Sequence, residues 1–400
     1  MTFTRRSFLA ATLATPLLQA ATPKLRITKL ELIPVRASER TVWLIVKLST
    51  DKGLTGLGEA SDAFGYANTT KEQAAQMESE LRKFFVAVNG KSPFEVEAYR
   101  QKAMAVARAG GLIPSTAFSA IEQAMWDLAG QALGVPVHAL FGGKVRDTLP
   151  VYANINRATK NRVPAGFADT ARRAVAEGFR AVKAAPFDGF PALTRPAAEI
   201  EAAATLGIAC MAAIREAVGP EVDVMCDAHS FFSVPLAIEV AQKMEDLRLG
   251  WYEEPVAPER TAETLQIHRS IRQKMSGGET LFAIEGFEAL CREHAVDVIM
   301  PDVKHCGGLL ELSHIAAMAR SYGVLVAPHN PSGPVSTAAG VQMCAGLENF
   351  RYMELQWGET SWRGDLVSPV EKFEGGTILV PDRPGFGIQL NEKLAKSHPV

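Results

Sequence analysis

The chain has 400 residues and a mass of 43.1 kDa, enough for two or three domains or for a large barrel with a smaller companion domain. Apolar residues make up 47% and charged residues 22%, a balance that excludes a disordered chain. The net charge of −2 offers no basic excess for binding phosphates, so no nucleic acid is expected as a partner.

Residues 1–21 are predicted to be a signal peptide. The pair Arg5-Arg6 precedes an uncharged apolar stretch over 10–18, and small residues follow. This pattern resembles a twin-arginine export signal, so we expect a periplasmic or otherwise exported protein. The five cysteines form no CxxC pair, which argues against a disulfide scaffold or a structural zinc site. We expect no membrane partner, because no later apolar run approaches the roughly 18 residues of a membrane span.

Residues 25–150 are predicted to form an α+β domain. Apolar and polar residues alternate over 25–35, which is typical of a half-buried strand. The segments 42–49 and 54–60 flank the turn sequence T-D-K-G and indicate a hairpin. Helical stretches are then expected at about 70–88, 93–107 and 115–132.

From Pro150 onward, short apolar segments alternate with Ala-rich amphipathic helices. Eight strands are expected, at 150–154, 181–183, 222–227, 250–255, 276–280, 296–302, 323–329 and 350–355. This alternation predicts an α/β fold, a modified TIM-type (β/α) barrel over residues 151–375. A doubly wound sheet is the competing architecture, but no G-x-G-x-x-G follows a strand. Residues 376–400 are expected to return to the first domain.

Three carboxylates end three consecutive predicted strands. Two equal intervals of 26 residues, each the length of one β/α unit, separate Asp227, Glu253 and Glu279. The carboxyl ends of barrel strands converge on the active site, so these side chains should meet there. Three converging carboxylates repel one another unless a cation neutralises them, and hard oxygen ligands suit Mg²⁺.

Polar residues also end three later strands. Asp302 follows V-I-M-P, His329 follows L-V-A-P one unit later, and Glu354 lies on the eighth strand. An Asp on the neighbouring strand can hold a histidine in one tautomer and raise its basicity. We therefore favour His329 as a general base with Asp302 as its partner.

These residues belong to a set of motifs that resembles the enolase superfamily, in particular its mandelate-racemase-like branch. The resemblance covers roughly residues 25–390. It rests on G-F-R-A-V-K (178–183), D-A-H (227–229), Y-E-E-P (252–255), G-G-E (277–279), P-D-V-x-x-C-G-G (301–308), A-P-H-N (327–330) and N-F-x-x-x-E (349–354). It implies an α+β capping domain over the barrel, Mg²⁺ on Asp227, Glu253 and Glu279, and removal of the proton α to a carboxylate. Members of the superfamily are often oligomers, so a homo-oligomer is expected.

The resemblance also implies roles for two further residues and reveals one departure. Lys183 matches the first lysine of a K-x-K motif, which positions the metal-binding carboxylates and polarises the substrate carboxylate. Glu354 matches a residue that donates a hydrogen bond to the substrate carboxylate, for which it should be protonated. Ala185 stands where racemases carry their second lysine base. Proton exchange on both faces is therefore disfavoured.

His229 favours elimination instead. It lies two residues after Asp227, so in an extended backbone it would point into the barrel mouth beside the ligand. The Asp-x-His pattern is similar to that of acid-sugar dehydratases of the galactonate type, in which the histidine protonates the leaving β-hydroxyl. A structural hydrogen bond near the metal is the alternative. His305 and Lys304 receive no role, because a solvated loop explains them equally well.

Substrate contacts are expected from the capping-domain loops near 36–42 and 60–68, the second of which contains Tyr66. Asn154 and Asn156, at the end of the first barrel strand, are placed to bind substrate hydroxyls. The sequence thus predicts a Mg²⁺-dependent dehydratase that converts an acid sugar to a 2-keto-3-deoxy acid. A racemase, epimerase or cycloisomerase of the same superfamily is the alternative, and an exported non-catalytic binding protein is a third.

Overall fold

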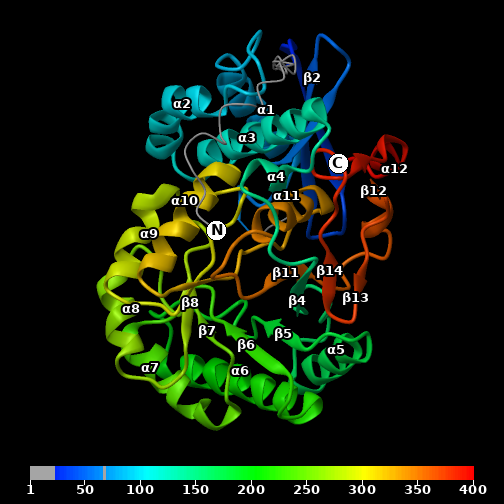
Figure 1. The fold of residues 1–400 in the computed structure, drawn as a ribbon. Helices are drawn as coiled ribbons and strands as arrows, with labels where there is room; N and C mark the ends of the chain where they lie inside the picture. Colours follow the sequence, from blue (N-terminus) through cyan, green and yellow to red (C-terminus); the bar gives the residue numbers. More distant parts are fainter. Residues whose placement is uncertain (1–22, 66–68) are drawn as a thin grey trace, which may run out of the picture.

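The structure is a computed structural model and describes residues 23–65 and 69–400. The predicted signal peptide and Tyr66 lie outside the described residues. The capping domain occupies the upper part of Figure 1 and the barrel the lower part.

The capping domain is a three-stranded antiparallel sheet covered by helices. Residues 51–53 close the predicted hairpin, and Gly53 takes the positive φ of 80° that this turn requires. The fully buried Phe118 and Ile121 of the third helix pack in one core with the sheet. The elements are β1 (Ile27–Arg36), β2 (Val42–Thr50), β3 (Thr55–Glu59), α1 (Lys71–Phe85), α2 (Val96–Gly110), α3 (Leu112–Leu133) and α4 (Val137–Leu140).

Eight parallel strands form the barrel in the described part of the chain. They are β4 (Thr148–Asn154), β5 (Ala181–Ala184), β6 (Asp223–Asp227), β7 (Tyr252–Glu253), β8 (Met275–Gly277), β9 (Val298–Ile299), β10 (Leu325–Val326) and β11 (Met353–Gln356). Each of β4 to β10 pairs with the next strand, and β11 pairs with β4. A bridge between Val326 and Phe350 closes the circle. The expected barrel is therefore confirmed, and the alternative prediction of a doubly wound sheet is wrong.

Seven helices of the described chain connect these strands: α5 (Pro164–Ala176), α6 (Ala197–Val218), α7 (Val234–Lys243), α8 (Thr261–His268), α9 (Ala283–Arg292), α10 (Gly308–Ser321) and α11 (Pro334–Cys344). A 3-10 turn, η2 (Glu245–Leu247), follows α7. By length and composition alone, α6 could cross a membrane, so the expectation that no later apolar run has spanning length is wrong. Its many alanines make it apolar, and its buried face, including Met211 and Ile214, packs into the barrel core.

The C-terminal segment only partly returns to the capping domain. After β11 come η3 (Arg363–Leu366), β12 (Val367–Ser368), β13 (Phe373–Glu374), β14 (Thr377–Leu379), β15 (Gln389–Leu390) and α12 (Glu392–Ser397). The hairpin β13–β14 extends the barrel sheet, because β14 pairs antiparallel with β4. The return begins later, where the Phe386 N–H donates to Asp127 of α3 at 2.7 Å and α12 reaches β1. Figure 1 shows α12 beside the capping sheet.

Glu122 of α3 forms hydrogen bonds between the capping domain and the barrel. Its carboxylate accepts the backbone N–H groups of Leu309 (2.8 Å) and Leu310 (2.9 Å) at the start of α10. An anion there satisfies unpaired helix donors. Gly308 has a φ of 85°, and a Cβ on it would lie 2.0 Å from the carboxylate. This contact explains the second glycine of the C-G-G motif.

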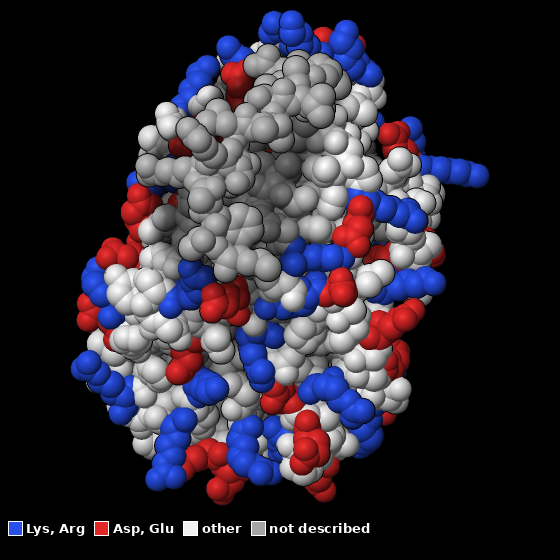
Figure 2. Space-filling model, in the orientation of Figure 1, with Lys and Arg blue, Asp and Glu red and all other residues white. Residues whose placement is uncertain are grey.

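The surface carries both signs of charge. On the face in Figure 2, Lys and Arg side chains lie interspersed with Asp and Glu over the barrel. This distribution agrees with the near-neutral net charge.

Candidate active site

The three predicted metal-binding carboxylates meet at the barrel mouth. Asp227 ends β6, Glu253 ends β7 opposite it in the strand register, and Glu279 follows β8 by two residues. One oxygen from each lies within 4.8 Å of the other two, and all three residues are buried. The 26-residue spacing thus correctly predicted their convergence.

Lys183, at the end of β5, lies against this cluster. Its buried Nζ is 2.7 Å from Glu253 Oε1, 3.1 Å from Glu354 Oε1 and 3.3 Å from Asp227 Oδ2. Burial lowers the pKa of Lys183, but Glu253 and Glu354 outweigh burial and raise it well above its usual value. The lysine is therefore cationic and partly neutralises the carboxylates.

One lysine does not neutralise the whole cluster. Burial raises the pKa of Glu253 well above its usual value, and the neighbouring Asp227 raises it further. Burial acts the same way on Asp227, but His229 and Lys183 outweigh it and hold that pKa below its usual value. A bound cation would offset the electrostatic repulsion between Glu253 and the neighbouring carboxylates. The buried all-oxygen donor set therefore fits a hard divalent cation.

His329 and Asp302 form the expected pair. His329 Nδ1 lies 2.8 Å from Asp302 Oδ2, and Nε2 lies 3.2 Å from Glu279 Oε2 at the cluster. Burial lowers the pKa of His329, but Glu279 and Asp302 outweigh it and raise the pKa to about 9. Nδ1 is held by Asp302, which leaves Nε2 to face the reaction site.

Glu354 differs from the expectation of a protonated carboxyl. It accepts hydrogen bonds from Asn154 Nδ2 (2.7 Å) and from the Asn330 backbone N–H (2.7 Å). Burial raises its pKa, but Lys183 and His329 outweigh burial and lower the pKa. The surrounding groups are donors that favour the charged form, so the carboxyl is ionised here.

His229 enters the site, although not for the expected reason. Its backbone is left-handed (φ 43°) rather than extended, and its N–H donates to Asp227 Oδ1 at 3.0 Å. This turn directs the imidazole back over the metal cluster, with Nε2 3.1 Å from Asp227 Oδ2. Burial lowers the pKa of His229, but Asp227 and Asp188 outweigh it and raise the pKa well above its usual value. The ring is therefore protonated at neutral pH.

Asp188 is the site residue that sequence reasoning missed. It lies in the loop after β5, and its Oδ1 is 2.6 Å from His229 Nδ1. Its Oδ2 accepts a hydrogen bond from Asn156 Nδ2 (2.8 Å) and lies 3.4 Å from Arg162 Nη2. The only signal in the sequence was an isolated acid in P-F-D-G-F, a pattern that does not reveal a partner 41 residues away.

The two predicted substrate-binding asparagines line the same cavity as His229 and His329. In this structure their amides hold Glu354 and Asp188, so they also position site carboxylates. Their contact with substrate hydroxyls stays a prediction, as does that of Tyr66.

Lys304 and His305 are buried, so the solvated-loop explanation is wrong. Burial lowers the pKa of His305 to about 4, and its Nδ1 lies 2.8 Å from Thr116 Oγ1 of the capping domain. Ala185 is also buried, and its carbonyl accepts a hydrogen bond from Arg162 at 2.6 Å. The position of the second racemase lysine therefore carries no titratable side chain.

Carboxylates and histidines at the mouth of a capped barrel define a class of enzymes that abstract protons next to carboxylates. Residues 24–142 match the family described as mandelate racemase / muconate lactonizing enzyme, N-terminal domain, and residues 166–394 match the family described as enolase C-terminal domain-like. The chain belongs to the enolase superfamily.

Relatives with named activities match most of the chain. A D-galactonate dehydratase of Variovorax paradoxus is 30% identical, covering 88% of this chain and 89% of its own. A D-xylonate dehydratase of Haloferax volcanii is 31% identical, covering 90% and 85%. A D-gluconate dehydratase of Thermoproteus tenax is also 31% identical, covering 89% and 69%.

Solved structures agree with these relatives. A member of the enolase superfamily from Salmonella Typhimurium superposes with a TM-score of 0.85 at 29% identity, covering 94% of this chain and 99% of its own. A mandelate racemase/muconate lactonizing enzyme from Sulfitobacter sp. has a TM-score of 0.84 at 29% identity, covering 94% and 96%.

Proposed function

We propose that this protein is a Mg²⁺-dependent dehydratase of an acid sugar. The observation that carries the proposal is a pair of His–Asp couples, His329–Asp302 and His229–Asp188, on either side of the carboxylate cluster. Their histidines follow β10 and β6, which lie four strands apart in an eight-stranded barrel and so face each other across its mouth. The dehydratase names of the relatives support the same reaction.

The residues divide the reaction between them. Asp227, Glu253 and Glu279 would hold Mg²⁺, which when bound supplies positive charge against the substrate carboxylate. Lys183 adds a second positive charge beside that carboxylate. Glu279 is the main group that raises the pKa of His329, so a cation that offsets its charge would leave the imidazole neutral. His329 Nε2 then takes the α-proton, while Asp302 keeps its Nδ1 in place.

Elimination then needs a proton on the leaving group. His229 is protonated and gives its Nε2 proton to the β-hydroxyl, which departs as water as the C–O bond breaks. The electron pair from the broken C–H bond forms the double bond of an enol. The enol tautomerises to the 2-keto-3-deoxy acid, so the overall change is the loss of one water molecule.

Epimerisation is the alternative that one observation favours, because histidines on two sides of the site could exchange protons on two faces of the α-carbon. Ala185 removes the usual second base, but His229 occupies the same side of the barrel, one strand further along. Analysis of the products separates the two reactions. Wild-type protein with MgCl₂ should convert at least one of D-galactonate, D-gluconate and D-xylonate, or a stereoisomer of these aldonates, to a semicarbazide-reactive keto acid. An epimer without keto acid would refute dehydration.

His229→Gln is expected to separate the two half-reactions. Removal of the α-proton needs His329 and the metal, whereas loss of hydroxide needs an acid worth about 10²–10⁴-fold in rate. The variant should therefore wash deuterium into the α-position of unreacted substrate while keto acid formation falls by that factor. NMR in D₂O measures both. His268→Gln, on α8 outside the site, is the matched control. Full dehydration would make His229 structural, and loss of both steps would assign it to holding Asp227 or the substrate.

Asp188→Asn should resemble His229→Gln in a milder form. The carboxylate holds His229 Nδ1 at 2.6 Å, and loss of such an outer-shell partner costs about 10–100-fold. Keto acid formation should fall by that factor while α-proton exchange persists. Asp382→Asn, an exposed residue paired with Lys144, is the control. An equal loss of exchange and dehydration would contradict the assigned role.

Export and self-association stay predictions from the sequence. Replacing Arg5-Arg6 by two lysines should leave the protein in the cytoplasm of a producing bacterium if the twin-arginine route is used. Light scattering of the purified protein would measure the size of the expected homo-oligomer.

A further inference from the structure

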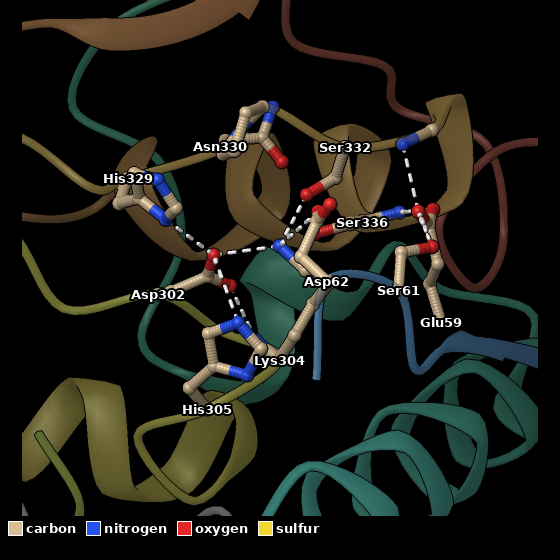
Figure 3. Close-up of polar contacts among 12 residues, drawn as sticks. Glu59, Ser61, Asp62, Asp302, Lys304, His305, His329, Asn330, Ser332 and Ser336 are labelled. Carbon is tan, nitrogen blue, oxygen red and sulfur yellow. Dashed lines mark hydrogen bonds and ion pairs between the residues drawn. The ribbon is translucent and has the colours of Figure 1, made fainter. Parts of the chain in front are cut away.

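Lys304 is a buried cation that the proposed reaction does not use. Its side chain is completely buried, and its Nζ lies 2.6 Å from Asp302 Oδ2. The same ammonium donates a hydrogen bond to the Ser332 hydroxyl. Figure 3 shows it at the centre of a polar network that includes His329 and residues of the capping domain. A buried charge is retained only where partners offset its desolvation, so these contacts define what the residue can do.

On one side, Lys304 holds the orienting carboxylate of the base. Asp302 Oδ2 is shared between Lys304 Nζ and His329 Nδ1, which is 2.8 Å away. Asp302 Oδ1 accepts the backbone N–H of Lys304 at 2.7 Å. Both oxygens are therefore tied to Lys304, and the rotamer of Asp302 that faces the imidazole depends on it.

On the other side, Lys304 faces the capping domain. Asp62, in the loop after β3, places its Oδ2 3.7 Å from Lys304 Nζ. That buried oxygen accepts no hydrogen bond from any residue of the described chain, and the Lys304 ammonium lies within ion-pair distance of it. Its other oxygen lies 3.4 Å from Arg157 Nη2. The Asp62 backbone is left-handed (φ 64°), a conformation that costs roughly 1–2 kcal/mol in a non-glycine residue and is held here by these ionic contacts.

A second contact between the same two segments lies beside this one. Glu59, three residues before Asp62, accepts the backbone N–H groups of Gly333 (2.7 Å) and Ser336 (2.9 Å). Gly333 adjoins Ser332, the hydroxyl partner of Lys304, and the same loop carries His329. The segment at the end of β3 therefore contacts the loop that carries His329 in two ways. Glu59 binds this loop directly, and Asp62 contacts it through Lys304 (Figure 3).

We propose that Lys304 is a positioning residue that couples the capping-domain loop at Asp62 to the orientation of the Asp302–His329 pair. The inference rests on the proposed function of His329 as the base. Lys304 does not touch the substrate in this scheme. It sets the carboxylate against which the imidazole is aligned, and Asp62 stabilises the ammonium only when the capping loop is seated.

The test is a double-mutant cycle on Lys304→Met and Asp62→Asn, read as α-proton exchange in D₂O with the aldonate that the wild type dehydrates. Lys304→Met should slow exchange about 100-fold and Asp62→Asn about 10-fold, the range for loss of an outer-shell partner. KM should stay within about threefold, because neither residue binds substrate in this scheme. In the Lys304→Met background, Asp62→Asn should cost less than about twofold, because its route to the base is already cut. Lys304→Arg should restore most of the exchange rate, since it keeps the charge.

Lys47→Met is the matched control. It removes a lysine that bridges Glu31 and Glu392 at 3.3 and 2.7 Å within the capping domain and α12, away from the base. Its exchange rate should equal that of the wild type.

Each failure has a distinct meaning. Additive losses, wild-type exchange in Lys304→Met, or a raised KM with unchanged kcat in Asp62→Asn would each overturn the proposal. If Lys304→Met does not fold, Asp62→Asn alone must still slow exchange at constant KM, and a wild-type rate would overturn the coupling. Absence of exchange in the wild type with every aldonate, or wild-type exchange in His329→Asn, would instead refute the proposed function.

Discussion

Glu253→Gln is expected to abolish turnover and to weaken Mg²⁺ binding by more than the roughly 10–100-fold loss typical of an outer-shell residue. Glu253 contributes one of the three clustered carboxylates and also lies 2.7 Å from Lys183 Nζ. Its second oxygen accepts a hydrogen bond from Trp251 Nε1 at 2.9 Å. A glutamine removes the charge and turns an N–H₂ group toward one of these two donors. Calorimetric titration with MgCl₂ measures the affinity, and keto acid formation measures turnover.

Glu288→Gln is the matched control for this variant, because it removes the same charge from a partly exposed residue that pairs with Arg292 on α9. It should bind Mg²⁺ and turn over like the wild type. Undiminished turnover of the wild type after thorough chelation would refute the metal requirement itself.

His329→Asn is expected to stop exchange of the substrate α-proton with solvent deuterium, and dehydration with it. A positioned general base contributes about 10²–10⁴-fold, and His329 is the residue whose imidazole contacts both Asp302 (2.8 Å) and Glu279 (3.2 Å). Asparagine keeps the polarity of the site but cannot accept the proton. Proton NMR in D₂O follows the loss of the α-proton signal.

Asp302→Asn should lose less activity than His329→Asn, because the imidazole remains and loses only its orienting partner. His314→Asn, on the partly exposed side of α10, controls for loss of a histidine. Exchange at the wild-type rate in His329→Asn would show that another group is the base.

The barrel and its metal cluster could be predicted because both follow from chain-local periodicity. A strand, a turn and a helix take about 26 residues here, so an acid that ends one strand and recurs at that interval ends the next strands as well. Parallel neighbours bring those ends to one edge. Asp302, His329 and Glu354 follow on later strands at intervals of 23, 27 and 25 residues, and the structure confirms the contact between Asp302 and His329.

Expectations failed where the outcome depended on local backbone turns. His229 was expected to point inward along an extended strand, yet β6 ends at Asp227 and a left-handed turn brings the ring over the cluster. Residues 376–400 were expected to return to the capping domain, yet the first part of this segment, β14, adds to the barrel sheet beside β4. Strand ends and edge pairing depend on neighbours that are distant in sequence.

Charge states depended on distant neighbours as well. Glu354 was expected to be protonated, but Lys183 and His329, from β5 and the β10 loop, lower its pKa. Lys304 and His305 were interpreted as residues of a solvated loop, but α3 and the end of β3 cover them. The sign of such effects cannot be read from residue type, because burial and partner charge oppose each other.

By itself, the sequence determined the barrel, the three clustered carboxylates and the His329–Asp302 pair, because each follows from regular spacing along one chain; the cap over the barrel came from the resemblance to the superfamily. Only the tertiary structure decided that Asp188 partners His229 and that Lys304 joins the base to Asp62 of the capping domain. These contacts form between irregular loops of separate elements. Their geometry is set by how the domains pack, which no local period encodes.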